Sequence, residues 1–221
     1  MTRILTHLHS EDDLAHALDY LAGQDAVFRD ALQRCGMPAL RRRAPGFEGL
    51  AAIITGQQLS THAARSIWKR FEDALGRVSA DTVSRASDEE LAACGMSRPK
   101  IRTLRALVDA VERGGLDFAR LETADDETVH ADLTAIKGIG PWTAGVFLLF
   151  CLGRADAWPA GDLALMEAIR LMRGHDRRPR GEECILAADC WRPYRGAAAH
   201  LLWAYYADAK GRSGVPDASG E

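Results

Sequence analysis

The sequence predicts an all-α fold, and three observations support this expectation. Apolar residues recur every three or four positions along most of the chain, as on one face of a helix. Within residues 162–172 they are Leu163, Met166, Ile169 and Met172. Runs that alternate apolar and polar residues, as half-buried strands do, are missing from the sequence. Glycine and proline separate the periodic segments, so we expect roughly ten helices.

These segments follow one another without a long linker. Further apolar stripes cover residues 14–32, 50–54, 63–75, 101–111, 143–152, 185–191 and 197–206. We therefore expect a single helical domain over residues 1–209, made of two packed lobes, with the N- and C-terminal segments forming the second lobe. A groove between two lobes is the natural place for a ligand. Residues 210–221, rich in Gly, Ser, Pro and Asp, are expected to be a flexible tail.

Composition restricts the class of protein. A chain of 221 residues is long enough to bury its core without a metal or disulfide. No window approaches 18 apolar residues, and the N-terminus lacks the pattern of a signal peptide, which predicts a cytoplasmic protein. The five cysteines form no CxxC pair, and their odd number argues against a secreted disulfide framework.

The charge pattern leaves the class of partner open. A net charge of −3 is unfavourable for a nucleic-acid-binding protein, because phosphate neutralisation needs Lys and Arg. Basic residues nevertheless gather in residues 41–43, 98–105 and 173–180. This segregation permits a basic face, and ordinary solvated helix surfaces explain it equally well.

The most informative stretch is IKGIGPWTAG, residues 136 to 145. Gly138 and Gly140 allow positive φ and close approach of another backbone, and Pro141 suits the first turn of a helix. Such a turn points the unpaired N–H groups of the second helix outward, where they bind an anion such as a DNA phosphate. By itself, the GxG spacing fits an ordinary turn between two helices even better.

Asp162 stands twenty residues after Trp142, directly before a helical stripe. The ordinary role of such an aspartate is to cap the helix. The cap amides and the helix dipole also favour the ionised carboxylate. A fixed negative charge of this kind stabilises an oxocarbenium-like sugar, so a catalytic role is the alternative to the structural one.

Taken together, IKGIGPWTA and the following Asp162 resemble the helix-hairpin-helix motif of the DNA glycosylase superfamily. Residues 50–71, LAAIITGQQLSTHAARSIWKRF, and 191–206, WRPYRGAAAHLLWAYY, are similar to the 3-methyladenine DNA glycosylase II family. The resemblance covers about residues 45–206. It implies two helical lobes with a central DNA-binding cleft and a helix-hairpin-helix at about residues 126–152.

The resemblance also implies roles for individual residues. Asp162 would be catalytic, and the indoles of Trp142 and Trp203 would form the base pocket. An electron-rich indole attracts a cationic alkylated base flipped out of the duplex. Gln58 would fill the gap that the flipped nucleotide leaves, with capping of the helix end beside Gly56 as its structural alternative. Arg195 would orient Asp162 or hold a phosphate. DNA contacts are implied for Gln58, Lys137, Gly138, Gly140, Thr143 and Arg195, and the backbone carbonyls of Thr134, Ile136 and Ile139 would hold a monovalent cation.

Departures from family patterns refine the chemistry. Bifunctional relatives carry a lysine where this chain has Trp142, so no lyase activity is expected. Val146 replaces a frequent tyrosine, which leaves the substrate range open. Only Cys184 and Cys190 lie near the C-terminal end, so no iron–sulfur cluster is expected. The seven histidines form no zinc site and are predicted to be surface or core-edge residues.

The sequence therefore predicts a monofunctional DNA glycosylase without a cofactor, acting as a monomer on double-stranded DNA. Its substrates would be alkylated bases, chiefly 3-methyladenine together with 7-methylguanine and related lesions, released by hydrolysis of the N-glycosidic bond in base excision repair. Two alternatives remain. One is a catalytically silent DNA-binding module, and the other is a glycosylase for deaminated or oxidised bases.

Overall fold

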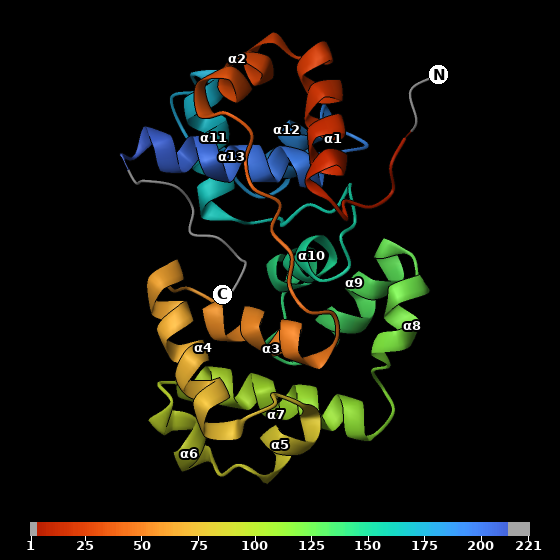
Figure 1. Ribbon diagram of the computed structural model, residues 1–221, viewed down its shortest axis with the longest axis vertical. Coiled ribbons are helices and arrows are strands. Elements are labelled where there is room, and N and C mark those ends of the chain that lie inside the picture. The colour runs from red at the N-terminus through yellow and green to blue at the C-terminus, as the bar shows by residue number, and fades with distance from the viewer. Residues whose placement is uncertain (1–3, 212–221) are drawn as a thin grey trace. The chain divides into compact units, whose positions relative to one another are not determined.

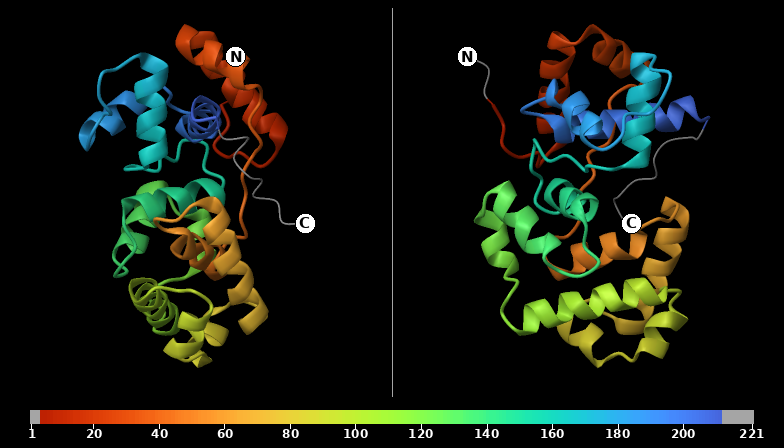
Figure 2. Two further views of the ribbon diagram at one scale, coloured as in Figure 1. Left: turned by 90° about the vertical axis from the view of Figure 1, so that its left-hand side faces the viewer. Right: turned by 180° about the vertical axis from the view of Figure 1, so that it is seen from behind.

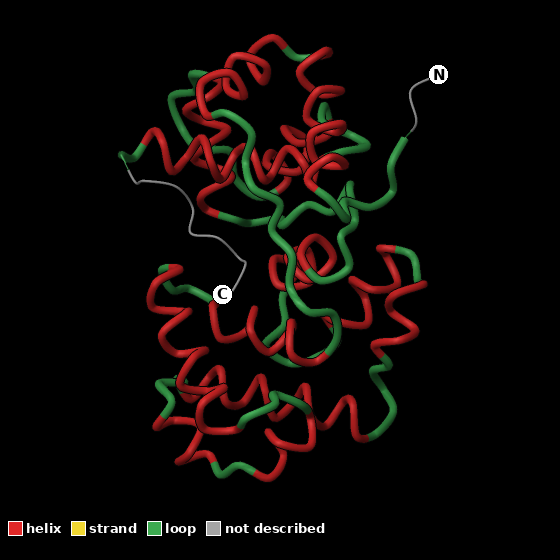
Figure 3. The backbone as a smooth tube through the Cα atoms, in the orientation of Figure 1, coloured by secondary structure: helices red, strands yellow, loops and turns green. Residues whose placement is uncertain are grey.

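The protein is helical throughout the part of the chain that the structure describes. The computed structural model describes residues 4–211, which consist of helices connected by loops and turns (Figure 3). Among these residues there is also one isolated antiparallel bridge, between His7 and Arg154. The predicted all-α class is confirmed, with thirteen helices among these residues rather than about ten. The predicted flexible tail lies outside the described residues, except for Lys210 and Gly211.

The chain divides into two compact units. The first unit joins the segment up to Arg42 to the segment from Leu152 onward, and the second unit comprises Arg43–Cys151 (Figure 1). The helices of the first unit are α1 (Glu11–Gln24), α2 (Ala26–Cys35), α11 (Leu163–Arg173), α12 (Glu182–Asp189) and α13 (Arg195–Ala209).

Helix α13 is the central element of the first unit. It is buried continuously from Gly196 to Trp203, and it packs against α1, α2 and α11 (Figures 1 and 2). A helix that is apolar on all sides belongs inside a core.

Backbone hydrogen bonds join the two ends of the chain within this unit. Leu8 N–H donates to the Gly153 carbonyl at 2.7 Å, and Ala155 N–H donates to the Thr6 carbonyl at 2.9 Å.

The sequence predicted one continuous stripe over residues 14–32, but two helices form there. Asp25 separates α1 from α2, since its Oδ1 accepts hydrogen bonds from the N–H groups of Val27 and Phe28 at 3.0 and 3.1 Å. A side-chain acceptor placed before two unpaired amides starts a new helix. The same carboxylate pairs with Arg173, which attaches the start of α2 to the end of α11.

The second unit has its own core. Its helices are α3 (Phe47–Gly56), α4 (Thr61–Leu75), α5 (Ala80–Arg85), α6 (Asp88–Ala93), α7 (Arg98–Glu112), α8 (Phe118–Thr123), α9 (Asp126–Thr134) and α10 (Pro141–Phe150). Every residue of α10 from Thr143 to Phe150 is buried, and this helix packs against α3 and α9. Side-chain caps at Ser60, Ser79, Ser87, Asp117 and Asp125 fix where the surrounding helices start. Within residues 4–211, no helix is long and apolar enough to cross a lipid bilayer.

Candidate active site and nucleic-acid interface

The glycine-rich stretch forms a tight hairpin between α9 and α10. Gly138 has a φ of +94°, and Gly140 is the N-cap of α10 without a side-chain cap. Pro141 occupies the first turn, as predicted. Amides in the first turn of a helix have no carbonyl partner within that helix. The hairpin therefore has the backbone geometry that binds anions.

Helix α7 packs closely against this hairpin. A Cβ atom added to Gly138 would lie 2.0 Å from Oγ1 of Thr103 on α7, so any larger residue would clash there. Thr103 is itself buried and donates its hydroxyl to the Pro99 carbonyl at 3.1 Å. The glycine is thus required by both the backbone angle and the packing.

The end of α3 is fastened to the hairpin by a residue that the sequence analysis missed. Nε2 of Gln57 donates to Oγ1 of Thr143 at 2.9 Å and reaches the Gly138 carbonyl at 3.4 Å. Thr143 is 2% exposed, so its hydroxyl is engaged inside the protein. The consecutive glutamines after Gly56 gave no indication of this contact, because its partners lie more than 80 residues away in the chain.

The other glutamine, Gln58, is exposed. Its φ of +58° is the only positive value at a non-glycine residue within the described chain. Left-handed residues of this kind cost free energy and are concentrated at functional sites. The geometry is compatible with the predicted gap-filling role, which stays a prediction.

Basic side chains accompany the hairpin. Lys137 on the hairpin and Arg98 and Arg102 on α7 are exposed, and within residues 4–211 none of them forms an ion pair. Arg102 directly precedes Thr103, which contacts Gly138. The second unit therefore carries exposed positive charge on the hairpin and on α7, the helix that packs against it, despite the net charge of −3.

Asp162 is held by three donors within the first unit. It is the N-cap of α11, and its Oδ1 accepts from the N–H groups of Ala164 at 2.9 Å and Leu165 at 3.0 Å. Nε1 of Trp203 donates to the same oxygen at 3.3 Å. The capping role and the predicted catalytic role are therefore compatible, since the cap fixes the carboxylate in place.

Trp203 and His200 form a buried pair on one face of α13. Their ring centres lie 6.1 Å apart in an edge-on arrangement. The prediction that all histidines are surface or core-edge residues is wrong for His200, which is 2% exposed. Burial lowers the pKa of its imidazole to about 4. Its isolated position in the sequence gave no indication of this, because burial arises from the packing of α13.

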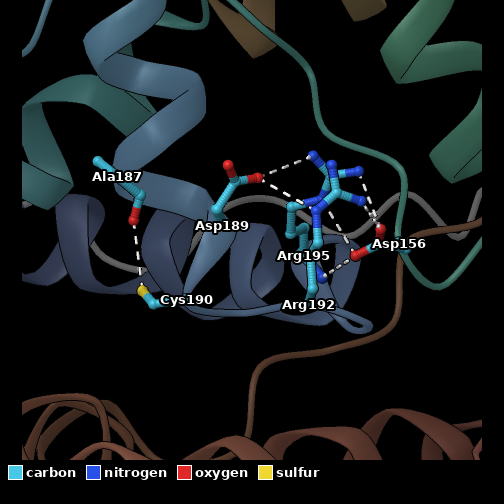
Figure 4. A network of polar contacts seen from close by, with 6 residues as sticks. All are labelled: Asp156, Ala187, Asp189, Cys190, Arg192 and Arg195. Carbon is cyan, nitrogen blue, oxygen red and sulfur yellow. Dashed lines mark hydrogen bonds and ion pairs between the residues drawn. The ribbon is translucent and has the colours of Figure 1, made fainter.

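Arg195 is bound to Asp156 (Figure 4). Its Nε donates to Oδ1 at 3.0 Å and its Nη2 to Oδ2 at 2.9 Å, while Arg192 donates to Oδ2 at 2.6 Å. Asp156, which the sequence analysis did not single out, thus ties the loop before Asp162 to the start of α13. If Arg195 orients Asp162, it does so through Asp156 and this loop. Both predicted roles of Arg195, orienting Asp162 and binding a phosphate, stay predictions.

The predicted site residues are divided between the two units. Asp162, Trp203 and Arg195 belong to the first unit, and the others belong to the second. Trp142 is half-buried in the first turn of α10, and Val146 one turn later is 4% exposed.

The carbonyls proposed for a cation lie at the hairpin. The Ile136 carbonyl accepts from Ile139 N–H at 3.0 Å. Neutral carbonyl oxygens can bind a hard cation weakly. The cation site formed by the carbonyls of Thr134, Ile136 and Ile139 stays a prediction. Among residues 4–211, no group of three or more His, Cys, Asp or Glu side chains is arranged to hold a metal ion.

Comparison with known proteins identifies the family of the chain. Residues 51–193 match the family model of the HhH-GPD superfamily base excision DNA repair proteins. DNA-3-methyladenine glycosylase 1 of Schizosaccharomyces pombe is 31% identical over 198 residues, covering 86% of each chain.

Solved structures agree with the sequence match. A DNA-3-methyladenine glycosidase from Bacillus halodurans superposes with a TM-score of 0.73 at 34% identity, covering 89% of this chain and 92% of that one. A 3-methyladenine DNA glycosylase from Schizosaccharomyces pombe, solved in complex with abasic DNA, gives a TM-score of 0.79 at 27% identity, covering 88% and 96%. The chain therefore belongs to the HhH-GPD superfamily of base excision DNA repair proteins and is of the 3-methyladenine DNA glycosylase type.

Proposed function

We propose that this protein is a monofunctional DNA glycosylase that flips alkylated bases out of double-stranded DNA and hydrolyses their N-glycosidic bond. The observation that carries the proposal is the Asp162 carboxylate, fixed by two helix amides and the Trp203 indole N–H. Relatives in yeast and bacteria that carry the name 3-methyladenine glycosylase support alkylated purines as the substrates.

The chemistry follows from the fixed charge. As the bond between C1′ and the base nitrogen breaks, its electron pair leaves with the base, and positive charge develops on the sugar. Asp162 stabilises that charge. Water then adds to C1′ and loses a proton, which gives an abasic site and the free base. An N3- or N7-alkylated purine is already cationic, so the departing electron pair neutralises it.

The other residues bind and orient DNA in this proposal. A backbone phosphate is held by hairpin amides, those of Gly138, Gly140, Trp142 and Thr143. Lys137 adds positive charge beside them. Trp142 and Trp203 stack on the flipped base. Gln58 occupies the space that the nucleotide leaves, and the protein acts as a monomer.

The absence of lyase activity is part of the proposal. A Schiff base requires an amine that attacks C1′, and the chain has Trp142 where bifunctional relatives carry that lysine. The product strand should therefore stay intact until alkali cleaves the abasic site.

Replacing Asp162 with asparagine tests the mechanism. Asparagine also caps helices, so the Asp162→Asn variant should fold and bind DNA like the wild type. Loss of the negative charge should lower base release by about 10²- to 10³-fold. Chromatography of the bases released from methylated DNA measures this, and the same samples run with and without alkali measure strand cleavage. Release at the wild-type rate by the variant, or strand cleavage without alkali, contradicts the proposal.

The two alternatives make different predictions for the wild type. A silent DNA-binding module releases no base from any substrate. A glycosylase for deaminated or oxidised bases releases hypoxanthine or an oxidised base faster than 3-methyladenine. Parallel release assays on 3-methyladenine, 7-methylguanine, hypoxanthine and 1,N6-ethenoadenine separate all three.

A further inference from the structure

Helix α3 ends in a tightened turn around Gln58. The Gln57 N–H donates to the Ile54 carbonyl at 3.2 Å, and the Leu59 N–H donates to the Gly56 carbonyl at 3.2 Å. Both bonds reach back three residues, where an α-helix reaches back four. Between them Gln58 takes its left-handed φ of +58°. A non-glycine residue keeps such a conformation only when the surrounding structure holds it there.

Two side chains attach this turn to other helices of the second unit. Nζ of Lys100, on α7, donates to the Thr55 carbonyl in the last turn of α3 at 2.7 Å. Thr55 is fully buried and Lys100 is half-buried. A cation at this end of a helix also interacts favourably with the helix dipole. The Gln57 side chain binds Thr143 on α10, so the backbone directly before Gln58 is fixed to α7 and to α10.

These contacts matter for a side chain that has to enter DNA. Gln58 is exposed, and its own backbone angle is unfavourable. If its conformation were free to change, only a fraction of the molecules would be ready to insert it, and the apparent strength of insertion would fall by that fraction. Contacts that fix the turn before DNA binds remove this loss.

We propose that Gln57 and Lys100 are positioning residues that hold Gln58 in the conformation in which it fills the gap left by the flipped nucleotide. Neither residue touches the reacting atoms in this proposal. It rests on the proposed function, which gives Gln58 the gap-filling role.

The test removes each contact and measures the step that uses Gln58. Gln57→Leu and Lys100→Met delete the donors at nearly constant side-chain size. Release of 7-methylguanine is followed in single turnovers at saturating enzyme, where all DNA is bound and changes in affinity drop out. Each variant should lower the rate constant about 3- to 10-fold, the effect of one lost hydrogen bond.

A second background separates positioning from general support of the structure. Gln58→Gly removes the side chain and accepts the positive φ without strain. It should lower the rate constant at least as much as either variant does. In this background, Gln57→Leu and Lys100→Met should change the rate constant by less than about twofold, because no side chain is left to position.

Two matched controls carry the same substitutions elsewhere. Gln33 on α2 is exposed, and Lys69 on α4 pairs with Asp73. Gln33→Leu and Lys69→Met should therefore release 7-methylguanine at the wild-type rate. Thermal unfolding identifies any variant that fails to fold, and Gln57→Ala or Lys100→Gln then takes its place.

The outcomes separate the two proposals. Wild-type rate constants in the folded single variants contradict the positioning role and leave the proposed function intact. Equal losses in the wild-type and Gln58→Gly backgrounds do the same, since they indicate an effect that does not pass through Gln58. A wild-type rate in Gln58→Gly alone contradicts both the gap-filling role and the positioning of Gln58. Failure of the wild type to release any base contradicts the proposed function itself.

Discussion

Individual side chains in this protein combine structural and chemical roles. Asp162 starts helix α11 and presents the carboxylate that the proposed mechanism uses. Trp203 is a core residue, 8% exposed, whose N–H also binds that carboxylate. An N-cap aspartate is ordinary in any helical protein, so the cap alone predicts no catalysis. Asp162 differs from an ordinary cap because it also accepts a hydrogen bond from Trp203, which lies on a different helix, α13.

His200 should make stability depend on pH. Its folded-state pKa of about 4 lies below the ordinary value near 6.5, because burial and the charges of Arg41 and Arg42 disfavour the imidazolium. Between these values the unfolded chain binds a proton that the folded protein does not. The free energy of unfolding should therefore fall as the pH is lowered from about 6.5, by on the order of 3 kcal/mol at pH 4.

Urea unfolding between pH 7 and pH 4 measures this dependence. His200→Gln should be less stable at pH 7 yet lose less stability on acidification, because glutamine does not titrate. His175 is exposed, so His175→Gln should follow the wild-type curve. Parallel curves for the wild type and His200→Gln would show that another group causes the acid sensitivity.

At the scale of elements, the hairpin is fixed by its neighbours rather than by its own sequence alone. Thr103 on α7 packs against Gly138, and Gln57 at the end of α3 binds Thr143 on α10. A short turn with a missing side-chain cap would otherwise be a weak point of the chain. Contacts with two separate helices keep its amides in one arrangement, as a preorganised anion site requires.

The two hairpin glycines should respond differently to alanine. Gly138→Ala places a Cβ 2.0 Å from Thr103 Oγ1 at a φ of +94°, so we expect a loss of about 2–4 kcal/mol in unfolding free energy. Gly140 has a φ of −101° and no atom within 4 Å of an added Cβ, so Gly140→Ala should unfold at nearly the wild-type temperature.

Differential scanning calorimetry compares the two variants directly. Equal thermal midpoints would mean that Thr103 moves aside without cost. A large loss in Gly140→Ala would mean that its backbone is less tolerant than its φ indicates.

The sequence was sufficient to predict the helical class, the hairpin and the Asp162 cap, because each depends on local spacing. It did not predict the break at Asp25, since apolar periodicity continues across it. Gln57, Asp156 and His200 were missed for a different reason. Their partners lie far away in the chain, and only the packing of α3 on α10 or the burial of α13 brings them together.

At the scale of the whole molecule, the net charge of −3 conceals an uneven distribution. Many basic side chains are bound internally, as Arg105 is to Asp88 and Arg173 is to Asp25. Around the hairpin, Arg98, Arg102 and Lys137 have no such ion pair within residues 4–211. DNA affinity should therefore depend on few charged contacts together with backbone amides.

This distribution predicts a shallow salt dependence. Three phosphate contacts give a slope of about −3 for the logarithm of affinity against the logarithm of salt concentration. Arg102→Gln should reduce its magnitude by about 1. Arg85 pairs with Asp81 on α5, so Arg85→Gln should leave the slope unchanged. Fluorescence anisotropy across a salt series provides the measurement, and a wild-type slope of −6 or steeper would show that further basic residues contact DNA.

The construction of the first unit from both ends of the chain has a consequence during synthesis on the ribosome. The second unit is contiguous and can begin to fold while later codons are still being translated. The contact between Asp162 and Trp203 must wait for α13, whose last residue is Ala209. A prematurely terminated chain can therefore carry the hairpin but not the Trp203 donor to Asp162, so the proposed mechanism predicts that unfinished molecules release no bases.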